Sequence, residues 1–176
     1  MFTLRFPESQ VQHWAERYSY SGDDGHLRDE LRPLILNRGY LNKDEFLEIC
    51  KWKTQRTKSR CASNDDFTIR TISRAALASS DEPLKMDLFR TLTGVEWPTA
   101  STLLHFCDAR PYPILDYRAL WTLGFSEPPH YTTAFWVEYV AFTRGLARRL
   151  DLDIRTLDQA LWQYSKARQR AGRHAA

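Results

Sequence analysis

The sequence predicts an all-α protein, and three observations carry that prediction. Apolar residues recur at intervals of three and four along most of the chain, which is the spacing of one helical face. Alternating runs typical of strands extend over no more than a few residues, and only seven glycines and eight prolines interrupt the 176 residues. We therefore expect one compact helical domain over residues 1–168, with room for two lobes around a cleft, and a frayed basic tail over residues 169–176.

Capping signals divide the chain into helices. The first helix is expected after Pro7, where a Ser9–Gln12 capping box precedes an apolar stripe. Asn42, followed three residues later by Glu45, predicts a second clear start. Further starts are expected at Asn64 or Asp65, at Asp81 and near Thr156, and the longest helical pattern covers residues 131–150.

The formal net charge of +3 is too small to indicate a nucleic-acid partner by itself, but the charges are unevenly distributed. The stretch 51–60 contains five basic residues and no acid: Lys51, Lys53, Arg56, Lys58 and Arg60. Such a run is either a solvated surface or a series of phosphate contacts.

Cysteine and histidine usage argues against a disulfide framework and against a metal site. The three cysteines, Cys50, Cys61 and Cys107, are odd in number and widely spaced, and the five histidines show no ligand spacing. No apolar stretch approaches the roughly 18 residues that a membrane helix requires. We expect reduced thiols, no membrane and a cytoplasmic protein, associated with the nucleoid when it binds DNA.

The stretch from Leu92 to Ser101 indicates two helices joined by a tight turn, within a hairpin over residues 86–107. Gly94 permits the turn, and Pro98 suits the first turn of the second helix, where its missing N–H costs nothing. The first amides of that helix would point outward and could bind a phosphate oxygen. An ordinary helical corner would have the same features. The candidate hairpin contacts to DNA are Gly94, Val95, Glu96, Trp97, Pro98, Thr99 and Ser101, with hydroxyl contacts from Thr99 and Ser101.

An apolar pair followed by an aspartate, Ile114-Leu115-Asp116, lies 18 residues beyond Pro98 and opens the segment 114–121. Together with the hairpin, this step resembles the helix-hairpin-helix (HhH-GPD) DNA glycosylase superfamily, of which the chain would be a short, divergent member. The specific resemblance covers residues 86–121. It implies DNA as the partner, a role in base excision repair, and a monovalent cation at the hairpin as the only cofactor to consider. The family's iron–sulfur cluster is not expected, because no cysteine follows Cys107.

The resemblance gives Asp116 a catalytic role. Cleavage of an N-glycosidic bond builds positive charge on the sugar, which a nearby carboxylate stabilises while it orients or activates water. An aspartate in this sequence context is also a good helix N-cap, and both roles can coexist.

Two departures from the family pattern restrict the activity. Pro98 stands where the bifunctional members carry a lysine nucleophile, so the resemblance implies base removal without strand cleavage by that route. Glu96 stands where the family usually has glycine, and its carboxylate would weaken or redirect phosphate binding.

A base taken out of the duplex needs aromatic faces to receive it. The candidates beside the expected cleft are Trp52, Tyr112, Tyr117 and Trp121, although aromatic residues at helical spacing are more often core. Trp136, Tyr139 and Trp162 are interpreted as packing. Arg118 either contacts phosphate or fixes the start of the helix that follows Asp116.

Three functions are consistent with these observations. The first is a monofunctional DNA glycosylase that releases a modified or mismatched base. The second is a non-catalytic helix-hairpin-helix protein that binds DNA. The third is a helical structural or interaction protein whose hairpin is only a corner.

Overall fold

The computed structural model describes residues 1–20, 22 and 24–169. Within these ranges the chain forms helices and no strand, so the all-α prediction is confirmed. The elements are η1 (Glu8–Gln10), α1 (Val11–Ala15), η2 (Leu27–Leu31), α2 (Arg32–Arg38), α3 (Lys43–Lys53), α4 (Lys58–Ala62), α5 (Asp66–Ala78), α6 (Glu82–Arg90), α7 (Trp97–Cys107), α8 (Tyr117–Thr122), α9 (Thr133–Arg149) and α10 (Ile154–Arg168). Apart from Gln169, the predicted basic tail lies outside the described residues.

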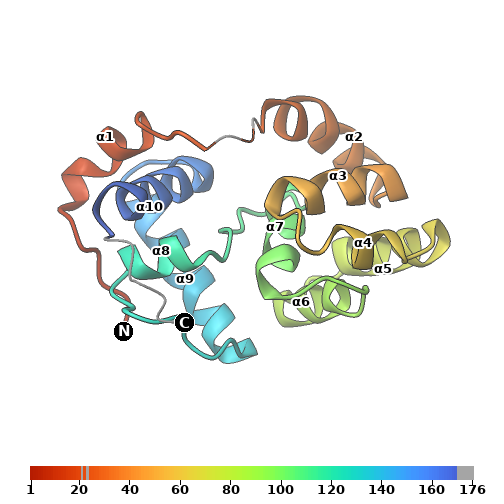
Figure 1. Cartoon of the computed structure of the whole chain (residues 1–176). Helices are drawn as coiled ribbons and strands as arrows, with labels where there is room; N and C mark the ends of the chain where they lie inside the picture. Colours follow the sequence, from red (N-terminus) through yellow and green to blue (C-terminus); the bar gives the residue numbers. More distant parts are fainter. Residues whose placement is uncertain (21, 23, 170–176) are drawn as a thin grey trace.

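The helices fall into two groups (Figure 1). One group contains α1, α8, α9 and α10, and the other contains α2 to α7. The first group is assembled from both ends of the chain. The amide of Thr3 donates to Leu123 O at 3.0 Å, the amide of Arg5 donates to Thr122 O at 2.9 Å, and α1 packs along α10. The second group is therefore an insertion between α1 and α8.

Side-chain caps set most of the helix starts that the sequence predicted. Asn42 and Glu45 form the expected capping box of α3, and Asp81 caps α6. Asp65 caps α5. The prediction of a Ser9–Gln12 capping box is wrong. A single 3-10 turn after Pro7 leads directly into a short α1, which has no side-chain cap.

The turn between α6 and α7 is the predicted hairpin. Gly94 adopts a φ of +84°, and a Cβ there would lie 2.9 Å from the backbone N of Cys61 in α4. Only glycine tolerates both conditions. The buried side chain of Asn64 holds the turn from the other side, since it donates to Thr93 O and accepts from Thr93 N at 2.9 Å each.

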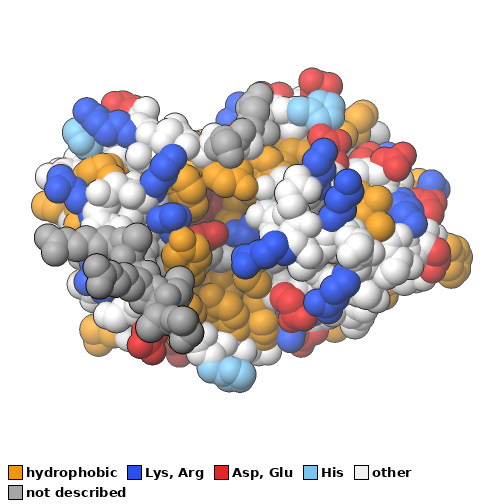
Figure 2. Space-filling model, in the orientation of Figure 1, with side chains coloured by type: hydrophobic (Ala, Val, Ile, Leu, Met, Phe, Trp, Pro, Cys, Tyr) orange, Lys and Arg blue, Asp and Glu red, His pale blue; other side chains and the backbone are white. Residues whose placement is uncertain are grey.

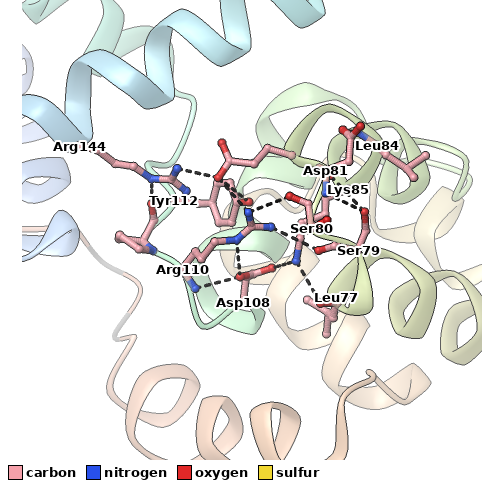
Figure 3. A network of polar contacts seen from close by, with 12 residues as sticks. Leu77, Ser79, Ser80, Asp81, Leu84, Lys85, Asp108, Arg110, Tyr112 and Arg144 are labelled. Atoms are coloured by element: carbon pink, nitrogen blue, oxygen red, sulfur yellow. Dashed lines mark hydrogen bonds and ion pairs between the residues drawn. The ribbon is translucent and has the colours of Figure 1, made fainter.

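A polar network joins the two groups where α9 meets the start of α6 (Figure 3). The Arg144 guanidinium donates to Glu82 Oε1 at 2.7 Å and to Pro111 O at 2.6 Å. Arg110 lies 3.3 Å from the same Glu82 oxygen. Beside it, Lys85 and Asp108 form an ion pair in which both side chains are almost fully buried. Removing one partner of such a pair leaves an uncompensated buried charge, so this network fixes how α6 lies against the chain that follows α7.

Candidate functional site

Asp116 is the N-cap of α8, and the loop before it is held from three sides. Its Oδ1 accepts from the amide of Arg118 at 2.9 Å, which confirms the capping interpretation. Ser101 Oγ, one turn into the hairpin helix α7, accepts from the amide of Leu115 at 2.8 Å. The Tyr139 hydroxyl donates to Ile114 O at 2.9 Å. These bonds fix the position of the aspartate relative to the hairpin.

The second carboxylate oxygen of Asp116 forms an ion pair with Lys53, which belongs to the other group of helices. Lys53 Nζ, at the end of α3, lies 2.8 Å from Asp116 Oδ2, with 12% and 23% of the two side chains exposed. Burial favours the neutral acid, but the charge and hydrogen bond of Lys53 outweigh it and lower the pKa of Asp116. Asp116 is therefore a carboxylate at neutral pH.

This ion pair forms part of the wall of a small cavity of about 90 Å³ between the two groups of helices. Its volume matches roughly three water molecules at about 30 Å³ each. The lining side chains come from both groups and from the segment after α1: Tyr18, Tyr20, Trp52, Lys53, Ile114, Asp116, Ala119, Arg155, Asp158 and Trp162. Figure 2 shows the surface hollowed between the groups, with hydrophobic side chains inside the hollow and Lys and Arg side chains along its edges.

Aromatic rings close the cavity around Tyr20. The Tyr20 ring meets the rings of Trp52 and Trp162 edge-on, with centroids 5.5 Å apart in each case. Its hydroxyl donates to Trp52 O at 2.9 Å. Trp52 was among the predicted base-contacting residues and lines the cavity. Trp162, interpreted from the sequence as packing, lines it too, as do Tyr18 and Tyr20, which the sequence did not single out.

The other three aromatic candidates lie elsewhere. Tyr112 is fully buried and stacks on Trp136 with centroids 6.2 Å apart. Tyr117 is about half exposed on α8, and Trp121 stacks on Tyr164. None of the three lines the cavity. Closeness to Asp116 in sequence therefore does not place these side chains in the cavity, and their contact with a base stays a prediction.

Asp158 is a second carboxyl group in the same cavity, and the sequence analysis missed it. Its Oδ2 accepts from the amide of Ile114 at 3.0 Å, and its Oδ1 is buried without a hydrogen-bond partner among the described residues. Burial raises its pKa to about 7, against the lowering charge of Arg155. The available signal was the i, i+4 spacing of Asp158 and Trp162, which puts both on one face of α10.

A histidine completes the polar group behind Asp158. His105 Nδ1 lies 2.6 Å from Tyr112 O and 3.5 Å from Asp158 Oδ2. Because a carbonyl oxygen only accepts, Nδ1 carries the proton. Burial, reinforced by the charge of Arg155, lowers the pKa of His105 to about 3, so the ring is neutral.

The basic side chains of the run 51–60 point in two directions, four toward solvent and one into the protein. Lys51, Arg56, Lys58 and Arg60 are exposed, as phosphate contacts require. Lys53 points inward to Asp116, so its assignment to phosphate is corrected. Arg118 is half-buried, with its guanidinium over the rings of Tyr117 and Trp162 at 5.2 and 5.4 Å.

The hairpin presents its backbone rather than its side chains. Val95, Trp97, Thr99 and Ser101 are buried. The Ser101 hydroxyl donates to Pro98 O at 2.8 Å while it accepts from Leu115, so the predicted hydroxyl contacts of Thr99 and Ser101 to phosphate are corrected. Glu96 is the exposed N-cap of α7, and its side chain makes no capping hydrogen bond to that helix.

Hydrogen bonds engage carbonyls of the turn, and each carbonyl that accepts one hydrogen bond keeps a lone pair for the predicted monovalent cation. Leu92 O accepts from Val95 N at 3.1 Å and Thr93 O accepts from Asn64, so two of them already have partners. No cluster of three or more His, Cys, Asp or Glu side chains suited to a metal occurs in residues 1–20, 22 and 24–169. Cys50, Cys61 and Cys107 are buried free thiols that form no disulfide. In the same described ranges, no helix is long and apolar enough to cross a membrane.

Comparison with protein-family models, with curated proteins and with solved structures gave no match to this chain.

Proposed function

We propose that the protein is a monofunctional DNA glycosylase that acts on a base received in the cavity beside Asp116. The observation that carries the proposal is the position of Asp116: an ionised carboxylate in an aromatic cavity, tied by the Ser101–Leu115 hydrogen bond to the helix of a glycine hairpin. The carboxylate would stabilise positive charge on the sugar, and the rings would stack on the base.

DNA would be held at the mouth of the cavity without sequence reading. Glu96 leaves the first amides of α7 uncapped by its side chain, so they retain donors for a phosphate oxygen. The exposed Lys51, Arg56, Lys58 and Arg60 would hold neighbouring phosphates. At about 90 Å³ the cavity is small for a base, so base entry would require lining side chains to move.

The test is release of a base from oligonucleotides that carry uracil, oxidised, alkylated or mismatched bases, single-stranded and duplex, followed by hot alkali to reveal abasic sites. Asp116→Asn should abolish the product and keep DNA affinity, because asparagine caps a helix as well as aspartate does. The substitution also removes the carboxylate partner of Lys53, so circular dichroism is used to show that the variant is folded. Asp151→Asn is the matched control: Asp151 is exposed in a loop at φ 53°, a conformation that asparagine tolerates, and its product should be unchanged. Borohydride should trap no adduct at Pro98.

A non-catalytic DNA-binding protein is the second candidate, and the Lys53–Asp116 ion pair favours it. A carboxylate that is neutralised by a buried ammonium group already has a structural role, which is to join α3 to α8. For this candidate, retention on DNA that falls steeply with salt would occur without any abasic product. DNA retention that is weak and insensitive to salt would contradict both candidates and leave a helical interaction protein.

A further inference from the structure

A second, larger cavity shares Arg155 with the candidate site and is bounded by η2, the start of α2, the end of α7, the end of α9 and the start of α10. Its volume is about 580 Å³, within the range of roughly 300–1,000 Å³ typical of small-molecule sites. Six arginines contribute to its walls: Arg28, Arg32, Arg110, Arg144, Arg148 and Arg155.

Carboxylates neutralise only part of this charge. Four of the arginines pair with acids: Arg28 with Asp29, Arg110 and Arg144 with Glu82, and Arg155 with Asp24. Asp153 is the acid in the cavity wall itself, and its oxygens accept from the amide and hydroxyl of Thr156. Lys85 neutralises Asp108 nearby. Six guanidinium groups against four carboxylates leave two positive charges uncompensated.

Arg32 and Arg148 are the two arginines of the wall that pair with no carboxylate among the described residues. Arg32 donates one hydrogen bond, to His105 O at 2.9 Å, and has no carboxylate partner within the described part of the chain. Arg148 is exposed at the end of α9 and, within the same residues, has no hydrogen-bond or ion-pair partner. His105 adds no charge, because burial lowers its pKa to about 3. Both guanidinium groups keep free donors for an anion.

The remaining walls are apolar and rigid. Phe106, Pro111, Ala147, Leu152 and Ile154 line the cavity between the arginines. Arg110 and Arg144 are held against the Tyr112 ring at 5.6 and 4.6 Å and clamped to Glu82, as Figure 3 shows for their side of the network. A ligand that fits this cavity needs an apolar or planar body as well as an anionic group.

We propose that this cavity binds a phosphate monoester with a planar or apolar body, of which a nucleoside monophosphate is the simplest example. A phosphate monoester carries a charge of about −1.5 to −2 at pH 7, which matches the two uncompensated arginines. The body would lie against Phe106 and Leu152, and the phosphate would bridge Arg32 and Arg148. This proposal is independent of the DNA glycosylase function.

The test is isothermal titration calorimetry with adenosine 5′-monophosphate, adenosine and inorganic phosphate. The monophosphate should bind more tightly than either part. Arg148→Gln should lower its affinity roughly tenfold, as expected for loss of a charge-assisted hydrogen bond, and Arg148→Glu should lower it further. Arg148 has no partner in the described residues, so neither variant should disturb folding.

Arg149→Gln is the matched control. Arg149 is the next residue on α9, but its guanidinium pairs with Glu8 at 2.6 Å outside the cavity, so the affinity for the monophosphate should be unchanged. Backbone amide NMR shifts should move at Ala147 and Leu152. The proposal is overturned by absence of binding at millimolar monophosphate, by equal affinity for adenosine, by equal loss in the Arg148 and Arg149 variants, or by a single-stranded oligonucleotide that displaces the monophosphate with much higher affinity.

Discussion

The buried carboxyl group of Asp158 makes folding stability depend on pH in a way that a single substitution isolates. The pKa of Asp158 is raised from 3.8 to about 7 in the folded protein by burial. Between these two values the folded state holds a proton that the unfolded state has released, so the stability contributed by the neutral acid is complete below pH 4 and is lost as the pH rises through 7. Each tenfold change in an acid constant corresponds to about 1.4 kcal/mol, so the loss is about 4 kcal/mol.

Asp158→Asn removes this dependence, because the amide is neutral at every pH and its oxygen can still accept from Ile114 N. Urea unfolding followed by tryptophan fluorescence should give similar stabilities for the two proteins at pH 4. As the pH rises, the free energy of unfolding of the variant should exceed that of the original protein by an increasing amount, which reaches about 4 kcal/mol at pH 8. Groups that titrate in both proteins cancel in this difference, and His105 is neutral throughout the range because its pKa is about 3.

Asp153→Asn is a control for which the pH dependence of stability should have the opposite sign. Burial opposes ionisation of Asp153, but hydrogen bonds from the hydroxyl and amide of Thr156 outweigh it and lower its pKa. Its contribution to stability is therefore present at neutral pH and is lost as the pH falls. The Asp153 variant should be less stable than the original protein at pH 7 and should approach it in acid. A stability difference for Asp158→Asn that stays flat from pH 4 to 8 would refute the reasoning, since Asp158 would then be ionised in the folded protein.

Two further substitutions test how the hairpin is held. Ser101→Ala should lower the free energy of unfolding by about 1–3 kcal/mol, because the buried amide of Leu115 loses its acceptor. Equal stability of the alanine variant in urea unfolding would contradict this. Gly94→Ala should lower the free energy of unfolding by more than the roughly 1 kcal/mol that φ strain alone imposes, because the new Cβ would lie 2.9 Å from Cys61 N. Hydrogen exchange should show α4 and the turn opening together. Unchanged exchange in α4 would show that the contact relaxes freely.

The sequence predicted those features that short-range physics decides. The caps at Asn42, Asp81 and Asp116 depend on a side chain and amides two or three residues away, and the Gly94 turn depends on one residue's conformation. Each is readable because the interacting groups are neighbours in the chain. The Ser9 box failed for a related reason, since a competing local turn after Pro7 took its place.

The composition of the cavity was not predictable in the same way. Tyr20, Lys53 and Asp158 meet through contacts between segments that lie many residues apart, and no local pattern reports them. Lys53 stands in a run of exposed basic residues, and only the packing of α3 against the loop before α8 shows that its ammonium group points inward. The same limit explains Ser101, whose hydroxyl is bonded to a residue 14 positions away.

The two carboxyl groups of the small cavity are held in opposite protonation states by different surroundings. Asp116 has a lysine and a helix amide as partners, and these keep it ionised. Asp158 has one amide, a neutral histidine and an orphaned oxygen, and burial raises its pKa to about 7. The negative charge of Asp116 itself raises the pKa of Asp158, so the ionised state of one supports the neutral state of the other. The reaction proposed for this cavity would use that difference, because it needs a carboxylate beside the sugar and a proton donor beside the base.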